Sequence, residues 1–138
     1  MAYRRCGDVL PHSFPLIRYG QLLLGQAELS GPEGTRRLWL LLDTGSNYTV
    51  VAVAALEAVG CSPASSGEHV RITTADGVLI APRVRTEALT VFERRLPGAL
   101  IIAHDLPFTG PIDGLLGMDV LVALRARIDV AGAQIELA

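Results

Sequence analysis

Glycine and proline interrupt this chain at short intervals, with 14 Gly and 8 Pro among its 138 residues. The runs between them are short and rich in Val, Leu, Ile and Thr, which are residue types that favour β-strands. This pattern predicts an all-β fold. The length suits one ordinary domain, which we place at residues 16–138 behind an N-terminal extension at 1–15 that could be flexible.

The composition excludes several classes of function. The formal net charge is -2, and the charged residues are interspersed without a basic block, so we expect no nucleic-acid partner. His12, His69 and His104 show no metal-ligand spacing, and Cys6 and Cys61 form no CxxC pair. We therefore expect no metal and no cofactor. Two free thiols are the simpler expectation for the cysteines, and a single disulfide stays open.

No run in the sequence reaches the roughly 18 to 20 apolar residues of a membrane-spanning helix. The first twenty residues contain Pro11 and Pro15 where a signal peptide needs an unbroken apolar stretch. We expect a soluble, cytoplasmic protein with no membrane segment. A periplasmic location would remain possible if an upstream anchor is missing from this sequence.

Nine strands and two short helices are expected along the chain. The expected strands are residues 16–29 (one long or bent strand), 37–42, 49–52, 69–74, 78–84, 88–96, 99–103, 127–130 and 134–137. The expected helices are residues 54–59, ended by Gly60, and residues 120–125. The pair Asp76-Gly77 lies between two β-rich runs and predicts a hairpin turn there.

Two short segments echo each other. Two leucines precede a tight loop at Leu41-Leu42-Asp43 and again at Leu115-Leu116-Gly117, and a predicted helix follows each loop. The two halves of the chain therefore look like duplicated units. Only the first unit carries an acid at its turn.

Residues 41–50 read Leu-Leu-Asp-Thr-Gly-Ser-Asn-Tyr-Thr-Val, and residues 114–119 read Gly-Leu-Leu-Gly-Met-Asp. Together with the intervening hairpin, they resemble the retropepsin-like aspartic protease family, in its bacterial, single-domain, homodimeric type. The resemblance extends over residues 17–137. It implies a closed acid-protease β-barrel with a flap hairpin and one or two short helices, and aspartic endopeptidase activity.

The resemblance assigns catalysis to Asp43 with Thr44 and Gly45, supported by Ser46, whose hydroxyl could donate to the Asp43 carboxylate. Proteases of this class use two carboxylates that share a proton and activate a water molecule. The chain has one such acid loop, so a second Asp43 has to come from another subunit of a homodimer. Glycine at position 45 lets backbone amides approach the carboxylate.

The resemblance also implies an extended peptide or protein substrate bound under the flap, with apolar side chains beside the scissile bond. The residues expected to contact substrate are Asn47, Val50, Thr74, Ala75, Asp76, Gly77, Val78, Asp113 and Leu115. An ordinary surface hairpin at 74–78 and a surface-turn role for Asp113 stay open. Asp119 opens a predicted helix, where a carboxylate is favoured for structural reasons, so we do not expect it to be a second acid.

Asn47 and Met118 occupy positions where viral relatives commonly carry a charged pair, and here both are neutral. The hairpin also has fewer glycines than viral flaps. These departures leave open a second reading: an inactive or weakly active dimerisation or peptide-binding module with the same fold. An unrelated β-barrel with a chance Asp-Thr-Gly turn is a third reading.

Overall fold

A computed structural model describes residues 12–74, 77–108 and 110–138 of the chain. Ala75, Asp76 and Cys6, which carry predictions made from the sequence, lie outside the described residues. Residues 12–15, which we assigned to the N-terminal extension, form a strand. Within the described ranges, no helix is long and apolar enough to cross a membrane.

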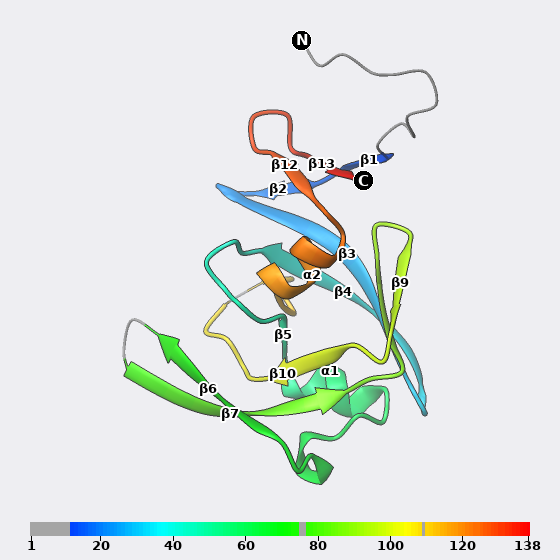
Figure 1. Ribbon diagram of the computed structural model, residues 1–138, viewed down its shortest axis with the longest axis vertical. Coiled ribbons are helices and arrows are strands. Elements are labelled where there is room, and N and C mark those ends of the chain that lie inside the picture. The colour runs from blue at the N-terminus through cyan, green and yellow to red at the C-terminus, as the bar shows by residue number, and fades with distance from the viewer. Residues whose placement is uncertain (1–11, 75–76, 109) are drawn as a thin grey trace.

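The described chain is mostly β-structure (Figure 1). Its strands are β1 (His12–Pro15), β2 (Ile17–Tyr19), β3 (Leu22–Gly31), β4 (Gly34–Leu42), β5 (Val50–Val51), β6 (His69–Thr74), β7 (Gly77–Arg85), β8 (Ala88–Val91), β9 (Arg94–Pro97), β10 (Leu100–Ala103), β11 (Gly114–Leu116), β12 (Arg127–Asp129) and β13 (Gln134–Leu137). Its helices are α1 (Val53–Ala58), the short 3-10 helix η1 (Pro63–Ser65) and α2 (Met118–Ala123).

Two sheets form the molecule. In the described chain the larger sheet has ten strands and follows the order β6-β7-β10-β5-β11-β4-β3-β8-β9, with β2 paired to β3. It curls into a half-barrel, and the β6–β7 hairpin extends from one side of it (Figure 1). The smaller sheet joins the two ends of the described chain in the order β1-β13-β12. The predicted all-β fold with a hairpin and two short helices is confirmed.

Two stretches that were predicted as single strands are hairpins, so both predictions were wrong. Residues 16–29 turn back at Gly20, whose φ of 62° allows the tight turn between β2 and β3. Residues 88–96 turn back at Phe92 and Glu93, which adopt positive φ values of 50° and 60°. Non-glycine residues rarely adopt this conformation, so the sequence carried no turn signal at the second site.

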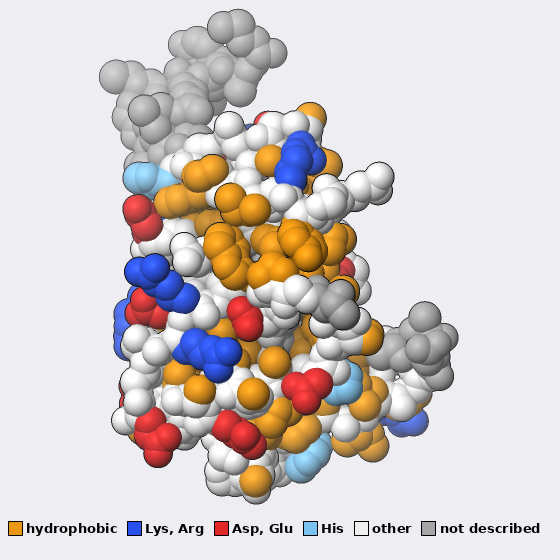
Figure 2. Space-filling view, turned by 180° about the vertical axis from the view of Figure 1, so that it is seen from behind, with side chains coloured by type: hydrophobic (Ala, Val, Ile, Leu, Met, Phe, Trp, Pro, Cys, Tyr) orange, Lys and Arg blue, Asp and Glu red, His pale blue; other side chains and the backbone are white. Residues whose placement is uncertain are grey.

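The core fills the inside of the curled sheet. Its most completely buried side chains are mainly leucines and isoleucines of the strands and of α1, including Leu24, Leu29, Leu38, Leu40, Leu56, Leu89, Ile101, Ile102, Leu116, Ile135 and Leu137. On the face seen in Figure 2, hydrophobic side chains gather across the middle, and arginine and acidic side chains are interspersed below them. The strands β4 and β11 lie inside the larger sheet, and every residue of β11 is buried.

Candidate active site

Asp43 follows the last residue of the central strand β4. The parallel strand β11 lies beside β4 with Leu115 opposite Leu41 and Leu116 opposite Leu42. The Asp43 amide then donates to the Leu116 carbonyl at 3.0 Å. The two similar segments of the sequence, Leu41-Leu42 and Leu115-Leu116, therefore lie side by side. This buried pair of strands positions Asp43.

The loop after β4 holds the carboxylate of Asp43. The Gly45 amide donates to Oδ1 of Asp43 at 2.9 Å, and a Cβ at position 45 would lie 3.2 Å from the same oxygen. Glycine therefore leaves room for the amide to approach the carboxylate, and it does not adopt a positive φ here. The hydrogen bond of the Ser46 hydroxyl differs from the one we expected. The hydroxyl donates to the Tyr48 carbonyl at 2.7 Å and not to the Asp43 carboxylate.

The glycines that flank Leu115 and Leu116 are also explained by close backbone contacts. A Cβ on Gly114 would meet the Val50 carbonyl, and a Cβ on Gly117 would meet the Tyr48 carbonyl and the Thr49 amide at 2.9 Å. Neither glycine has a positive φ. Gly114 lets β11 pack directly against the backbone of β5, and Gly117 allows the same close contact with the loop that carries Asp43.

Asp119 holds this loop through Thr49, which is 1 % exposed. The Thr49 hydroxyl donates to Oδ1 of Asp119 at 2.8 Å, and the Thr49 amide donates to Oδ2 at 3.1 Å. The same hydroxyl accepts from the Gly117 amide at 3.1 Å. Both carboxylate oxygens are thus engaged in structural hydrogen bonds, which agrees with the structural role expected for Asp119. Nothing in the local sequence identifies Thr49 as the partner.

The segments that contain the neutral residues Asn47 and Met118 are joined by backbone hydrogen bonds. The Met118 amide donates to the Ser46 carbonyl at 2.8 Å, and the Asp119 amide donates to the Asn47 carbonyl at 3.2 Å. These bonds tie the start of α2 to the loop after Asp43. The loop after Asp43 and the start of α2 are therefore connected although positions 47 and 118 carry no charged pair.

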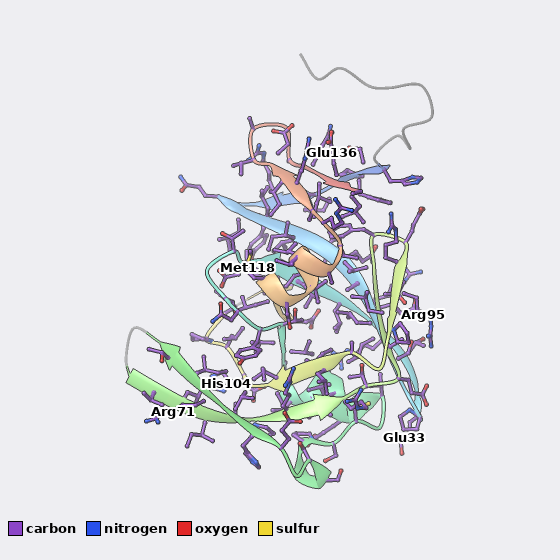
Figure 3. All side chains as sticks on the ribbon, in the orientation of Figure 1. Glu33, Arg71, Arg95, His104, Met118 and Glu136 are labelled. Atoms are coloured by element: carbon purple, nitrogen blue, oxygen red, sulfur yellow. The ribbon has the colours of Figure 1, made fainter. Side chains whose placement is uncertain are left out.

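A cavity of about 700 Å³ lies between this loop and the β6–β7 hairpin. It brings together most of the predicted site residues, namely Asp43, Gly45, Ser46, Asn47, Val50, Gly77, Val78 and Leu115. Among the described residues that line it, Asp43 is the one carboxylate. Arg71 on β6, labelled in Figure 3, also borders the cavity. Asp43 and Arg71 are therefore the Asp, Glu, Lys and Arg side chains among the described residues of the lining.

The hairpin forms as predicted, with Thr74 paired to Gly77 across the turn. Its inner face carries Ile72 and Leu79, which are cross-strand partners and line the cavity, whereas Val78 is 55 % exposed. The period of two along a strand could have identified Ile72 and Leu79 as inward-facing residues.

The cavity wall opposite the hairpin includes residues that sequence reasoning missed, namely Tyr48, His104, Leu106 and Pro107. Figure 3 shows His104 in the loop after β10, where its amide donates to the Val51 carbonyl at 3.1 Å. Nothing in the local sequence of this loop distinguishes it from a surface connection. Only the pairing of β10 with β5 brings it to the site.

Among the predicted residues whose side chains the structure describes, two lie outside the cavity lining. Asp113 exchanges hydrogen bonds with Trp39: the Trp39 amide donates to its carboxylate at 2.9 Å, and the Asp113 amide donates to the Trp39 carbonyl at 2.8 Å. The exposed Thr44 instead borders a separate groove beside α2. In the described parts of the chain, no three His, Cys, Asp or Glu side chains are grouped to hold a metal ion.

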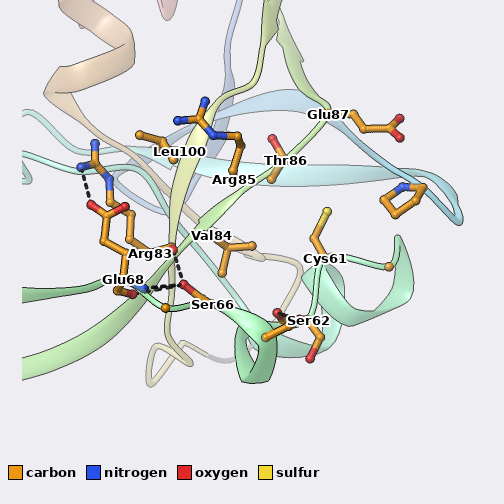
Figure 4. Close-up of a pocket in the computed structure, with 14 residues that line it drawn as sticks. Cys61, Ser62, Ser66, Glu68, Arg83, Val84, Arg85, Thr86, Glu87 and Leu100 are labelled. Carbon is orange, nitrogen blue, oxygen red and sulfur yellow. Dashed lines mark hydrogen bonds and ion pairs between the residues drawn. The ribbon is translucent and has the colours of Figure 1, made fainter.

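A further cavity of about 600 Å³ lies at the base of the hairpin (Figure 4). Its polar groups bond mainly to one another: Arg83 pairs with Glu68 at 3.2 Å, and the Ser66 hydroxyl bonds to the Arg83 and Glu68 carbonyls. Cys61 lies in its wall as a buried free thiol. Burial raises the pKa of Cys61, and the nearby charge of Glu87 acts in the same direction.

We expect the Cys61 thiol to react with a disulfide reagent at least about tenfold more slowly in the native protein than in the unfolded chain, because the thiolate is the reactive form. A Cys6→Ser background isolates this residue. Equal native and unfolded rates would contradict the burial of Cys61.

The raised pKa of Cys61 also predicts how the free energy of unfolding depends on pH. Because folding raises this pKa from 9.0, the stabilisation is retained below pH 9.0 and declines above it, where the thiol of the unfolded chain ionises first.

Comparison with known proteins identifies the family. Residues 26–120 match the family model described as aspartyl protease, and no curated protein gives a match. The structure resembles the crystal structure of a retropepsin-like aspartic protease from Rickettsia conorii, with a TM-score of 0.67 and 12 % sequence identity, over 97 % of this chain and 96 % of that one. Because the family model spans more than half of the chain, the chain belongs to the aspartyl protease family. It is a hydrolase of peptide bonds.

Proposed function

We propose that this protein is a homodimeric endopeptidase in which the Asp43 carboxylates of two subunits form one catalytic dyad. The observation that carries this proposal is the isolation of Asp43 as the one carboxylate among the described residues of the cavity. A single carboxylate cannot act as general base and general acid in the same step. A second copy supplies the missing acid by symmetry.

The reaction follows from the two carboxylates. The ionised Asp43 takes a proton from a water molecule while the protonated Asp43 gives its proton to the carbonyl oxygen of the scissile bond. The water oxygen bonds to the carbonyl carbon and forms a neutral tetrahedral diol. Breakage of the carbon–nitrogen bond then transfers a proton to the departing nitrogen, and it leaves a new carboxyl group and a new amine.

The cavity wall supports a preference for apolar side chains beside the scissile bond. Val50 and Leu115 line it on the catalytic side, and Ile72 and Leu79 line it on the hairpin side. Apolar substrate side chains gain by leaving water for such surfaces. The hairpin can act as a flap that covers the bound peptide and excludes water.

The test is cleavage of a peptide library at mildly acidic pH. We expect cleavage between apolar residues and inhibition by a pepstatin-type mimic of the tetrahedral diol, because the dyad would bind that group more tightly than substrate. A purified dimer that cleaves no peptide at any pH would contradict the proposal. Peptide binding that persists in Asp43→Asn, without turnover in the native protein, would instead indicate a peptide-binding module.

A further inference from the structure

Arg83 is a charged residue on the inward-facing side of the β6–β7 hairpin, near its base. Along β7, Leu79 lines the cavity of about 700 Å³ at Asp43, and Ala81 is buried in the hydrophobic cluster next to that cavity. Side chains alternate along a strand, so Arg83 shares the face of these two residues. Arg83 itself borders the separate cavity of about 600 Å³ shown in Figure 4, and not the cavity at Asp43.

The guanidinium of Arg83 lies over the ring of Tyr48, with its central carbon 5.9 Å from the ring centroid. Tyr48 belongs to the loop that follows Asp43, and it lines the cavity there. A guanidinium over an aromatic ring is attracted by the negative charge of the π-system. The backbone of Tyr48 is held separately, because its carbonyl accepts from the Ser46 hydroxyl at 2.7 Å. The part of Tyr48 that Arg83 holds is therefore the ring.

Contacts with the start of the hairpin keep Arg83 in this position. Its Nη1 lies 3.2 Å from Oε1 of Glu68, and its amide donates to the Glu68 carbonyl at 2.9 Å. Its carbonyl accepts from the Ser66 hydroxyl, as the dashed lines in Figure 4 show. Glu68 immediately precedes β6, so these contacts close the base of the hairpin. One side chain thus contacts both the base of the hairpin and a residue of the catalytic loop.

We propose that Arg83 is a positioning residue of the protease, which holds the Tyr48 ring as a fixed wall for a substrate side chain. The proposal rests on the proposed function, because it takes the cavity at Asp43 as the site of a bound peptide. An aromatic ring offers an apolar or aromatic side chain a large, flat contact. A ring that is already held in place loses less freedom when the peptide binds, so Arg83 strengthens binding without touching the substrate.

The test compares Arg83→Met with Arg85→Met, both of which replace an arginine by an unbranched, uncharged side chain. Arg85 is the matched control, because it lies on the same strand and borders the same 600 Å³ cavity, but its side chain donates to the Gly98 carbonyl. For a peptide that the native protein cleaves, we expect Arg83→Met to raise KM at least about threefold and to change kcat less than about twofold. Arg85→Met should change neither constant by more than about twofold.

Two further variants separate positioning through Tyr48 from a general loss of structure. Arg83→Lys keeps a cation near the ring, so we expect it to bring KM back to within about twofold of the native value. Tyr48→Leu removes the ring, and adding Arg83→Met to it should raise KM no further. Thermal melting checks that each variant folds, and Arg83→Gln repeats the test with a polar side chain. Equal effects of Arg83→Met and Arg85→Met, or additive effects of Arg83→Met and Tyr48→Leu, overturn the proposal.

Calorimetry of peptide binding, with and without Arg83→Met in an Asp43→Asn background, tells this proposal apart from the proposed function. If the native protein cleaves peptides and Arg83→Met leaves KM unchanged, the protease stands and the role of Arg83 fails. If no peptide is cleaved but Arg83→Met raises the peptide dissociation constant at least about threefold, the role of Arg83 stands and the proposed function fails. A protein that neither cleaves nor binds peptides contradicts both.

Discussion

Asp43→Asn should abolish peptide cleavage, with a loss of kcat of at least about a thousandfold. An amide in place of the carboxylate cannot accept the proton of the attacking water. The substitution keeps the size of the side chain and preserves the oxygen that accepts from the Gly45 amide. Folding and dimer formation should therefore be unchanged, and steady-state kinetics next to sedimentation measurements separate the two effects. Cleavage at the native rate would exclude Asp43 from catalysis.

A mixing experiment tests whether the dyad is shared between subunits. When a threefold excess of Asp43→Asn subunits exchanges with native subunits, random pairing leaves about a quarter of the native subunits in fully native dimers. Activity per native subunit should fall to about that fraction. Activity that stays constant on mixing would show that each chain carries a complete site.

Gly117→Ala should be strongly damaging although it adds only one methyl group. The added methyl group would meet the backbone of Tyr48 and Thr49, which cannot move without shifting the catalytic loop. We expect the free energy of unfolding to fall by about 3 kcal/mol, which lowers Tm by about 10 °C in a chain of this size. Thermal unfolding measures this loss. Activity should fall further than stability, because the position of Asp43 depends on the same backbone.

Gly67→Ala is the matched control for Gly117→Ala. A Cβ at Gly67 would meet nothing within 4 Å, and its φ is not positive. The free energy of unfolding should change by less than about 0.5 kcal/mol. If both variants unfold at the same temperature, close contact at Gly117 is not what makes glycine necessary there.

The local sequence was informative where a residue's role depends on its neighbours in the chain. An apolar run followed by Asp43-Thr44-Gly45 predicted a strand that ends at an acidic loop, and the structure has β4 ending at Leu42. The Asp-Gly signal predicted the β6–β7 hairpin. The turn at Phe92 and Glu93 was missed, because its positive φ values are imposed on residues that rarely adopt them.

Contacts between distant segments could not be predicted in the same way. Thr49 is fixed by Asp119, and His104 reaches the cavity through the pairing of β10 with β5. Each of these contacts depends on where two remote strands meet. A local pattern contains no such information.

The sequence by itself determined the all-β class and the acid loop at Asp43, because each depends on residue types in a short stretch. The tertiary structure alone decided how the acid is held. It placed β11 in register with β4, packed Gly114 against β5 and Gly117 against the loop that follows β4, and paired both edges of β13 within one chain. Strand register and close packing are properties of the whole folded core, so they exist only once the sheet has formed.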